Sequence, residues 1–246
     1  MVTQERLEKA YLKSPLEELA GRFAVALEQY RENPREKILR EHQYPWVDAL
    51  LDNLKKGKTA GFFGLFTGAG KTVFGEELIK ALEPKKTVVL SPTQLILFQT
   101  AKTFDQLGKG IYYTNYYSEE KRLGGEVLNT TYQSFFDLLN KGKINPQEIE
   151  LVICDEVHTA LGEQRHRMFR QLPNALMIGL TATPYFKNLL RHEKKGLVTH
   201  GERWVNLFIN PIHKVSLQEG IERGHTAPLD VDILTAHTRI KLPEET

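Results

Sequence analysis

The sequence predicts an α/β fold in which a mostly parallel β-sheet is flanked by helices, with a helical extension at the N-terminus. Two observations favour this class. From residue 60 onward, six short apolar runs alternate with stretches of helical periodicity, a pattern typical of strand–helix–strand units. Before that point, apolar residues recur at three- and four-residue steps, which is the spacing of amphipathic helices.

Length and composition indicate an ordinary globular chain. The 246 residues suit one large domain, and 41% hydrophobic residues can form a sizeable core. A formal net charge of +2 neither requires nor excludes nucleic acid as a partner. The single cysteine, Cys154, rules out an internal disulfide and fits a reducing compartment. Neither a signal peptide nor a membrane-length apolar stretch is evident, so a cytoplasmic protein with no membrane partner is expected.

Two helices are predicted ahead of the sheet. Ser14, Pro15 and Glu17 form a capping box with proline at the first helical position, and the helix they begin ends at Asn33-Pro34. A second helix begins at Pro45 and stops near Gly57.

The strands follow from residue 60. The apolar runs lie at residues 61–66, 87–91, 111–114, 126–129, 151–154 and 175–180. Helical patterns at residues 93–107 and 132–142 separate several of them, which favours parallel pairing with helices on both faces. Ligands of such sheets bind at the carboxyl ends of the strands, and each polar motif described below falls at such an end.

The stretch "FTGAGKT" (66–72) joins the first strand to a helix that starts near Lys71. Gly68 and Gly70 permit a loop whose backbone N–H groups point inward at phosphates, and the start of the helix adds its positive dipole end. Lys71 would reach the β- and γ-phosphates, and the Thr72 hydroxyl would hold Mg²⁺. The general phosphate-loop pattern has glycine where Leu65 stands. The alternative is a tight turn with an incidental Lys-Thr pair.

The stretch "LVICDEVHTA" (151–160) places Asp155 and Glu156 together at the end of a buried strand. Two adjacent carboxylates repel each other unless a cation offsets them. A magnesium–phosphate complex supplies that cation: Asp155 would bind the metal, and Glu156 would orient and deprotonate the attacking water. The alternative is an acidic N-cap of the following helix, which leaves His158 unexplained.

Taken in order, "FTGAGKT", "CDEVH" and "GLTATP" (179–184) resemble motifs I, II and III of superfamily 2 helicases and translocases of the DExH variety. "LREHQ" (39–43) resembles the adenine-reading segment of the branch that contains restriction translocases and excision-repair helicases. "SLQEGIERGHTAPL" (216–229) resembles the linker by which that branch leaves its first RecA-like domain. The resemblance implies a helical extension over residues 1–36, a RecA-like ATP-binding domain over 37–228, and a linker over 229–246 towards a second RecA-like domain.

The resemblance also implies roles for individual residues. Gln43, with Arg40 nearby, would recognise adenine. His158 would link the ATP site to Thr181 and Thr183, which couple the nucleotide state to domain closure. Without the motif, His158 would be a surface histidine, and the two threonines would be strand-end hydroxyls. The remaining ATP and Mg²⁺ contacts would come from Thr67, Gly68, Ala69, Gly70, Lys71, Thr72 and Asp155, with Lys71 and Glu156 as the catalytic residues.

Two further segments resemble the nucleic-acid contact motifs of the same superfamily. One is "VVLSPTQLILFQT" and the other is "VLNTTYQSF". Backbone N–H groups at the start of the helix after each strand could bind a phosphate. The alternative is that their threonines are ordinary N-caps. The residues concerned are Pro92, Thr93 and Gln94 in the first segment, and Thr130, Thr131 and Tyr132 in the second.

Together with the resemblance, these patterns predict the ATP-binding motor domain of a nucleic-acid-dependent ATPase, with ATP and Mg²⁺ as cofactors. The resemblance to restriction translocases and repair helicases implies that the domain moves along DNA rather than RNA. Two alternatives stay open: an RNA helicase domain, and an interaction module that binds nucleotide without turnover. The resemblance implies that arginine fingers and half of the nucleic-acid track come from a second domain, in the same protein or a partner chain.

Overall fold

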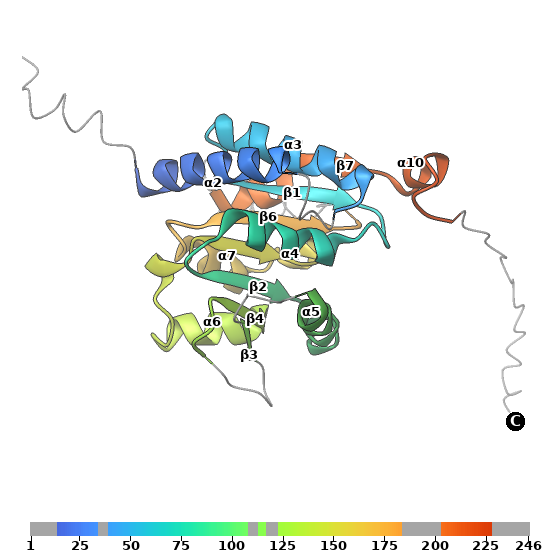
Figure 1. Ribbon diagram of the computed structural model, residues 1–246. Coiled ribbons are helices and arrows are strands. Elements are labelled where there is room, and N and C mark those ends of the chain that lie inside the picture. Colours follow the sequence, from blue (N-terminus) through green and yellow to red (C-terminus); the bar gives the residue numbers. More distant parts are fainter. Residues whose placement is uncertain (1–13, 34–38, 108–112, 117–122, 184–202, 228–246) are drawn as a thin grey trace, which may run out of the picture.

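The protein forms a seven-stranded sheet in which every pair of neighbouring strands is parallel, with the order β3-β4-β2-β5-β6-β1-β7 (Figure 1). This computed structural model describes residues 14–33, 39–107, 113–116, 123–183 and 203–227. The strands are β1 (Ala60–Leu65), β2 (Thr87–Ser91), β3 (Tyr113–Tyr116), β4 (Val127–Thr131), β5 (Leu151–Cys154), β6 (Leu176–Thr181) and β7 (Pro211–Val215). The predicted α/β class is confirmed.

The principal helices are α2 (Pro15–Glu32), α3 (Tyr44–Lys55), α4 (Lys71–Leu82), α5 (Gln94–Leu107), α6 (Tyr132–Asn140) and α7 (Glu163–Arg170). Two short helices follow, α9 (Asn206–Ile209) and α10 (Leu217–Glu222), and single 3₁₀ turns include η2 (Glu41–Gln43), η4 (Val157–Thr159) and η5 (Arg203–Val205). None of the helices that the structure describes is long and apolar enough to cross a membrane.

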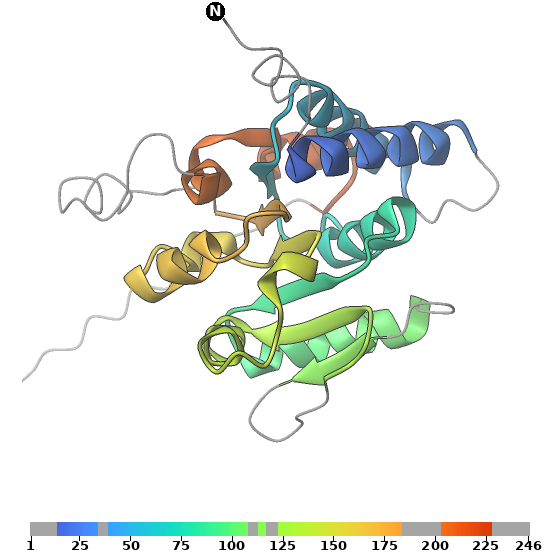
Figure 2. The ribbon, with the colours of Figure 1, turned by 90° about the vertical axis from the view of Figure 1, so that its left-hand side faces the viewer.

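Successive strand residues pack on opposite faces of the sheet, as the pleat of a strand requires. Phe63 of β1 joins the core beneath α2, α3 and α4, whereas its neighbour Phe62 joins the core beneath α6, α7 and α9. Figure 2 shows these two sets of helices on opposite sides of the sheet. All six residues of β1 are buried. Burial on both faces explains why the strands read as continuous apolar runs rather than as alternating patterns.

The N-terminal helix shares the core of the sheet. Its capping box is present: the Ser14 hydroxyl accepts from the Glu17 N–H at 3.2 Å, and the Glu17 carboxylate accepts from the Ser14 N–H at 2.7 Å. Phe23 and Leu27 are fully buried in the core that also contains Leu65 of β1. The helix α2 is therefore packed onto the α/β unit, while the domain boundary at residue 36 stays a prediction.

Three strands differ from the sequence prediction. The strand predicted at 126–129 is β4 (Val127–Thr131), so Thr130 and Thr131 belong to the strand and not to the start of α6. A strand was expected at residues 111–114, and the described strand β3 covers Tyr113–Tyr116, while 111–112 lie outside the described residues. The edge strand β7 was not predicted at all. It opens with Pro211, which lacks a backbone donor and is tolerated because only one side of an edge strand is paired. Only Ile212 and Val215 of its five residues are buried, so the segment lacks the continuous apolar run by which the other strands were predicted.

Parallel pairing brings the polar loops together. Gly64 of β1 lies opposite Thr181 of β6, and Cys154 of β5 lies opposite Gly179 of β6. The carboxyl ends of β1, β5 and β6 therefore lie side by side, along one edge of the sheet that runs across the strand ends. The loop before α4, the Asp155-Glu156 pair and the end of β6 become neighbours for this reason.

Leu27→Ala should destabilise the whole domain, because the buried side chain belongs to the core of the sheet. We expect the free energy of unfolding to fall by about 2–5 kcal/mol, the usual cost of removing a buried leucine. Val25→Ala, at a position 53% exposed on the same helix, is the control and should change it by less than about 0.5 kcal/mol. Urea denaturation followed by circular dichroism measures both. An unchanged midpoint for Leu27→Ala would show that α2 is not part of the cooperative unit.

Candidate functional site

The loop between β1 and α4 has the backbone of an anion cradle. Gly68 and Gly70 both have φ of +86°, a left-handed conformation that glycine adopts without strain. The helix α4 begins at Lys71, as predicted, and no side chain caps its N-terminus. Its first N–H groups and its positive dipole end therefore face the loop. Leu65, where the general pattern has glycine, is the buried last residue of β1, so no special backbone conformation is needed there.

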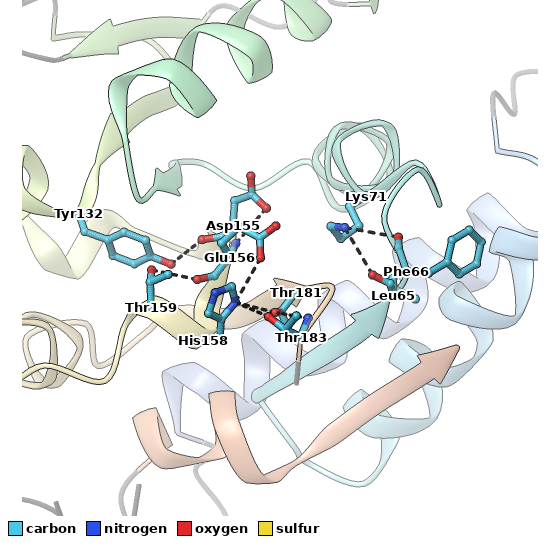
Figure 3. A network of polar contacts seen from close by, with 10 residues as sticks. All are labelled: Leu65, Phe66, Lys71, Tyr132, Asp155, Glu156, His158, Thr159, Thr181 and Thr183. Carbon is cyan, nitrogen blue, oxygen red and sulfur yellow. Dashed lines mark hydrogen bonds and ion pairs between the residues drawn. The ribbon is translucent and has the colours of Figure 1, made fainter. Parts of the chain in front are cut away.

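Lys71 is held above this loop by backbone carbonyls. Its ammonium group donates to the carbonyl oxygens of Leu65 at 3.4 Å and of Phe66 at 3.5 Å (Figure 3). Both contacts are long for hydrogen bonds, and the side chain is only half-buried. The Lys71 ammonium group therefore lies close to the loop and makes only weak hydrogen bonds to these two carbonyl oxygens. An anion bound on the loop could replace them as its partner.

Asp155 and Glu156 leave the end of β5 beside this loop. Burial first, and then the charge of Glu156, raise the pKa of Asp155 to about 6. The Glu156 N–H, which donates to Asp155 Oδ1 at 3.0 Å, and then Lys71 and His158 oppose that rise. Thr72 and Asp155, the two residues predicted to hold Mg²⁺, line the same small cavity. Glu156 has φ of +44° and ψ of +51°, a left-handed conformation that is unusual for a residue with a side chain.

His158 gathers three oxygens around one ring nitrogen. Its Nδ1 lies 2.9 Å from Thr181 Oγ1, 3.2 Å from Thr183 Oγ1 and 3.2 Å from Glu156 Oε2 (Figure 3). Thr181 is fully buried, and its hydroxyl also accepts from the Thr183 N–H at 3.1 Å. The residues predicted to couple the ATP site to the third motif therefore form one polar network. Pro184, the last residue of that motif, lies outside the described residues.

Gly179, to which sequence analysis gave no role of its own, makes this network possible. A Cβ at this position would lie 2.8 Å from Val157 Cγ1 and 3.1 Å from Phe62 Cβ. Only glycine lets η4, which carries His158, pack directly against β6.

Gln43 is engaged with the loop backbone. The side chain is 1% exposed, and its amide nitrogen donates to the carbonyl oxygens of Ala69 at 3.3 Å and Gly70 at 3.2 Å. Its amide oxygen accepts from the N–H of Arg40, whose side chain is exposed, at 2.9 Å. Recognition of adenine by Gln43 and Arg40 stays a prediction. His42, which sequence analysis did not single out, also contacts the Ala69 carbonyl, at 3.3 Å through Nε2.

The first predicted nucleic-acid segment is accessible. Thr93 and Gln94 are exposed at the start of α5, immediately after β2. Pro92, which precedes them, is half-buried. The Thr93 hydroxyl accepts from the Ile96 N–H at 3.4 Å, which is the N-cap role weighed as the alternative.

In the second segment the side chains are occupied within the fold. Thr130 is fully buried and donates to the Tyr116 carbonyl at 2.6 Å. Thr131 caps α6 by accepting from the Ser134 N–H at 3.2 Å. A phosphate contact at this segment would therefore have to use the backbone.

Tyr132 is 1% exposed and joins α6 to the carboxylate pair. Its hydroxyl donates to the backbone carbonyl of Asp155 at 2.9 Å. The Arg165 guanidinium lies over its ring, 4.8 Å from the centroid, and also donates to the Thr159 carbonyl. Arg165 was not anticipated, because nothing in the local sequence marks it.

The chain resembles known proteins over much of its length. It is 24% identical, over 87% of its own residues, to the "Type I restriction enzyme EcoAI endonuclease subunit" of Escherichia coli, and it spans only 27% of that protein.

Solved structures share the fold. The Pyrococcus furiosus Hef helicase domain matches 76% of this chain and 40% of its own, with 23% identity and a TM-score of 0.54. The nuclease-deletion mutant of the Type ISP restriction-modification enzyme LlaGI, in complex with a DNA substrate mimic, matches 76% of this chain and 21% of its own, with 17% identity and a TM-score of 0.57. The Sulfolobus solfataricus SWI2/SNF2 ATPase core, in complex with double-stranded DNA, matches 61% of this chain and 33% of its own, with 15% identity and a TM-score of 0.50.

These similarities confirm the predicted RecA-like α/β fold, which the matched helicase, restriction-enzyme and ATPase structures share. Residues 36–186, more than half of the chain, match the family described as "Type III restriction enzyme, res subunit". The chain therefore belongs to that family of restriction-enzyme res subunits.

Proposed function

We propose that this chain is the ATP-binding motor domain of a superfamily 2 helicase or translocase that hydrolyses ATP while acting on DNA. One observation carries the proposal. The uncapped start of α4, the adjacent carboxylates Asp155 and Glu156, and the His158 network meet at one edge of the sheet. An anion cradle beside a crowded carboxylate pair is suited to a phosphate chain that arrives with a divalent cation.

In this proposal the chain's own groups have separate tasks. Inward-facing N–H groups of the loop 67–72 and the Lys71 ammonium bind the phosphates. Thr72 and Asp155 hold Mg²⁺, which supplies positive charge that offsets the phosphate oxygens when bound. The fit is supported by the raised pKa of Asp155 and by the cavity that both residues line. Glu156 orients a water molecule and accepts its proton.

The remaining roles concern recognition and coupling. Gln43 and Arg40 lie beside the loop, where an adenine base would be read. One ring nitrogen of His158 contacts Glu156, Thr181 and Thr183. A change in the position or charge of Glu156 would therefore alter the contacts of His158 with the two threonines. Movement of the end of β6 would then follow the nucleotide state.

DNA is the proposed track, and the protein is proposed to be cytoplasmic. The chain's family and its curated relative are restriction enzymes, and two of the matching structures are described as complexes with a DNA substrate mimic or with double-stranded DNA. The backbone at Thr93 and Gln94, exposed after β2, and at Thr131 and Tyr132, the last residue of β4 and the first of α6, would take the phosphates.

The motor requires a second domain. We assign residues 1–36 to a helical extension, 37–228 to the ATP-binding domain and 229–246 to a linker towards a second RecA-like domain. The last of these ranges and residues 1–13 lie outside the described residues. Arginine fingers supply on the order of 10³–10⁵ in the rate of phosphoryl transfer, so turnover by this chain alone should be close to background.

Lys71→Ala should weaken the binding of Mg-ATP at least tenfold, or about 1.4 kcal/mol, because it removes the side-chain cation that lies over the loop. Isothermal titration calorimetry measures the affinity. Lys143→Ala removes an exposed lysine far from the loop in sequence and is the matched control. Equal affinities for the two variants would contradict the phosphate-cradle role.

Glu156→Gln should separate binding from hydrolysis in the full-length protein that carries the second domain. The amide is nearly isosteric and cannot accept a proton, so ATP should still bind while turnover falls roughly a hundredfold or more. Phosphate release is measured with duplex DNA, single-stranded DNA and RNA. Full turnover by the variant would exclude Glu156 as the base, and stimulation of the wild type by RNA alone would exclude DNA as the track.

Asp155→Asn should stabilise the protein when Mg²⁺ and nucleotide are absent. Because folding raises the pKa of Asp155 from 3.8 to about 6, its ionisation opposes folding. The penalty is absent below the unfolded pKa, develops between the two values and is complete above the folded pKa. We expect a gain on the order of 1–2 kcal/mol at pH 8 and a smaller one at pH 5.

Urea denaturation at both pH values tests this expectation, with Asp137→Asn on the exposed side of α6 as the control. The wild type, but not Asp155→Asn, should gain further stability from Mg-ATP. A destabilised Asp155→Asn protein at pH 8 would show that the carboxylate is satisfied in the fold and is not held ready for a cation.

A further inference from the structure

We propose that residues 216–227, which comprise α10 and His225, hold the phosphate loop in its binding conformation, with His225 as a positioning residue. This inference rests on the proposed nucleotide site and adds a structural element to it.

Topology places the segment beside the loop. The strands β1 and β7 are parallel and end in register, with Leu65 opposite Val215. The segments that follow these two strands therefore leave the sheet side by side. The segment after β1 is the phosphate loop, and the segment after β7 begins with Ser216. The Ser216 hydroxyl then accepts from the Glu219 N–H at 3.1 Å and starts α10 immediately. Because α10 starts directly after β7, the segment stays close to the end of β1, where the phosphate loop begins.

The first contact joins α10 to the start of the loop. Gly220 is buried in the middle of this short helix, where glycine is a poor helix former. A Cβ at this position would lie 2.7 Å from Cε1 of the Phe66 ring. Phe66 is 3% exposed and belongs to the same core as Val215. Glycine is required because the ring of Phe66 lies directly on the helix backbone.

The second contact reaches the middle of the loop through His42. The His225 ring stacks on the His42 ring with 4.5 Å between centroids and 29° between planes. Trp46 meets His42 edge-on at 5.6 Å. The two neighbours fix the plane of the His42 ring. Burial, followed by the charges of His225 and Arg40, lowers the pKa of His42, which favours a neutral ring in this stack.

His42 in turn orients a loop peptide. Its Nε2 donates to the Ala69 carbonyl at 3.3 Å, as the amide of Gln43 does from a second direction. A peptide unit is planar, so fixing the Ala69 carbonyl also fixes the N–H of Gly70, which points the opposite way. That N–H belongs to the set that would face the phosphates. His225 thus acts on the nucleotide through His42 and Ala69, without touching it.

The test is the affinity of the full-length protein for Mg²⁺ with a non-hydrolysable ATP analogue, measured by calorimetry. His225→Ala should bind about three- to tenfold more weakly, the effect expected from losing one aromatic pair. His225→Phe keeps a stacking ring and should bind within about twofold of the wild type. Gln218→Ala, at an exposed position on the same helix, is the matched control.

The outcomes separate this inference from the nucleotide site itself. Wild-type affinity in His225→Ala, together with lost affinity in Lys71→Ala, would overturn the positioning role and leave the site intact. Equal weakening by His225→Phe would overturn the stacking role. A wild-type protein that does not bind the analogue would overturn both proposals.

A second measurement does not depend on how the variants fold. Coupling between two sites is reciprocal, so the analogue should slow amide hydrogen exchange in residues 216–227 of the wild-type protein. Peptides from α7, on the opposite face of the sheet, serve as the reference. Unchanged exchange in 216–227 at saturating analogue would overturn the proposal.

Discussion

The whole site depends on the strand β1 being held between two parallel neighbours. Hydrogen bonds to β6 and β7 fix the point at which the chain leaves the sheet, and burial of every β1 residue prevents that point from shifting. The loop that follows has few side chains of its own with which to keep a shape. Its conformation is imposed from outside, by donors from η2 on its carbonyls and by the Phe66 ring locked against α10.

This support from neighbouring elements is needed because several features that disfavour folding lie together at the carboxyl ends of the strands. Asp155 lies half-buried beside a second carboxylate, Glu156 has a left-handed backbone, and the start of α4 lacks a side-chain cap. Each feature alone disfavours folding, by amounts on the order of one kcal/mol. Cores on both faces of the sheet make these local costs tolerable. Their concentration at one edge is the pattern expected of a site selected for binding rather than for stability.

The sequence predicted what lies within short contiguous stretches and missed what depends on distant partners. The loop 66–72 and the carboxylate pair were identified because their residues are adjacent and each follows a buried apolar run. The strand β7 was missed because "PIHKV" has no clear strand pattern of its own. It forms a strand through its pairing with β1, which is distant in sequence. The stacking of His42 on His225 was equally hidden, since no spacing rule relates them. Burial of Thr130 could not be foreseen, because its partner carbonyl belongs to β3.

Tyr132 has a mechanical consequence. Between its Cβ and its hydroxyl oxygen lies a flat aromatic ring that can turn about its axis but cannot shorten. One end is anchored at the first residue of α6, and the other is bonded to the carbonyl of Asp155. The Arg165 guanidinium covers one face of the ring. The Tyr132 side chain thus acts as a strut of fixed length between α6 and Asp155. If the start of α6 moves along the long axis of this side chain, either the hydrogen bond to the Asp155 carbonyl breaks or the backbone of Asp155, the residue proposed to hold the metal, moves with it.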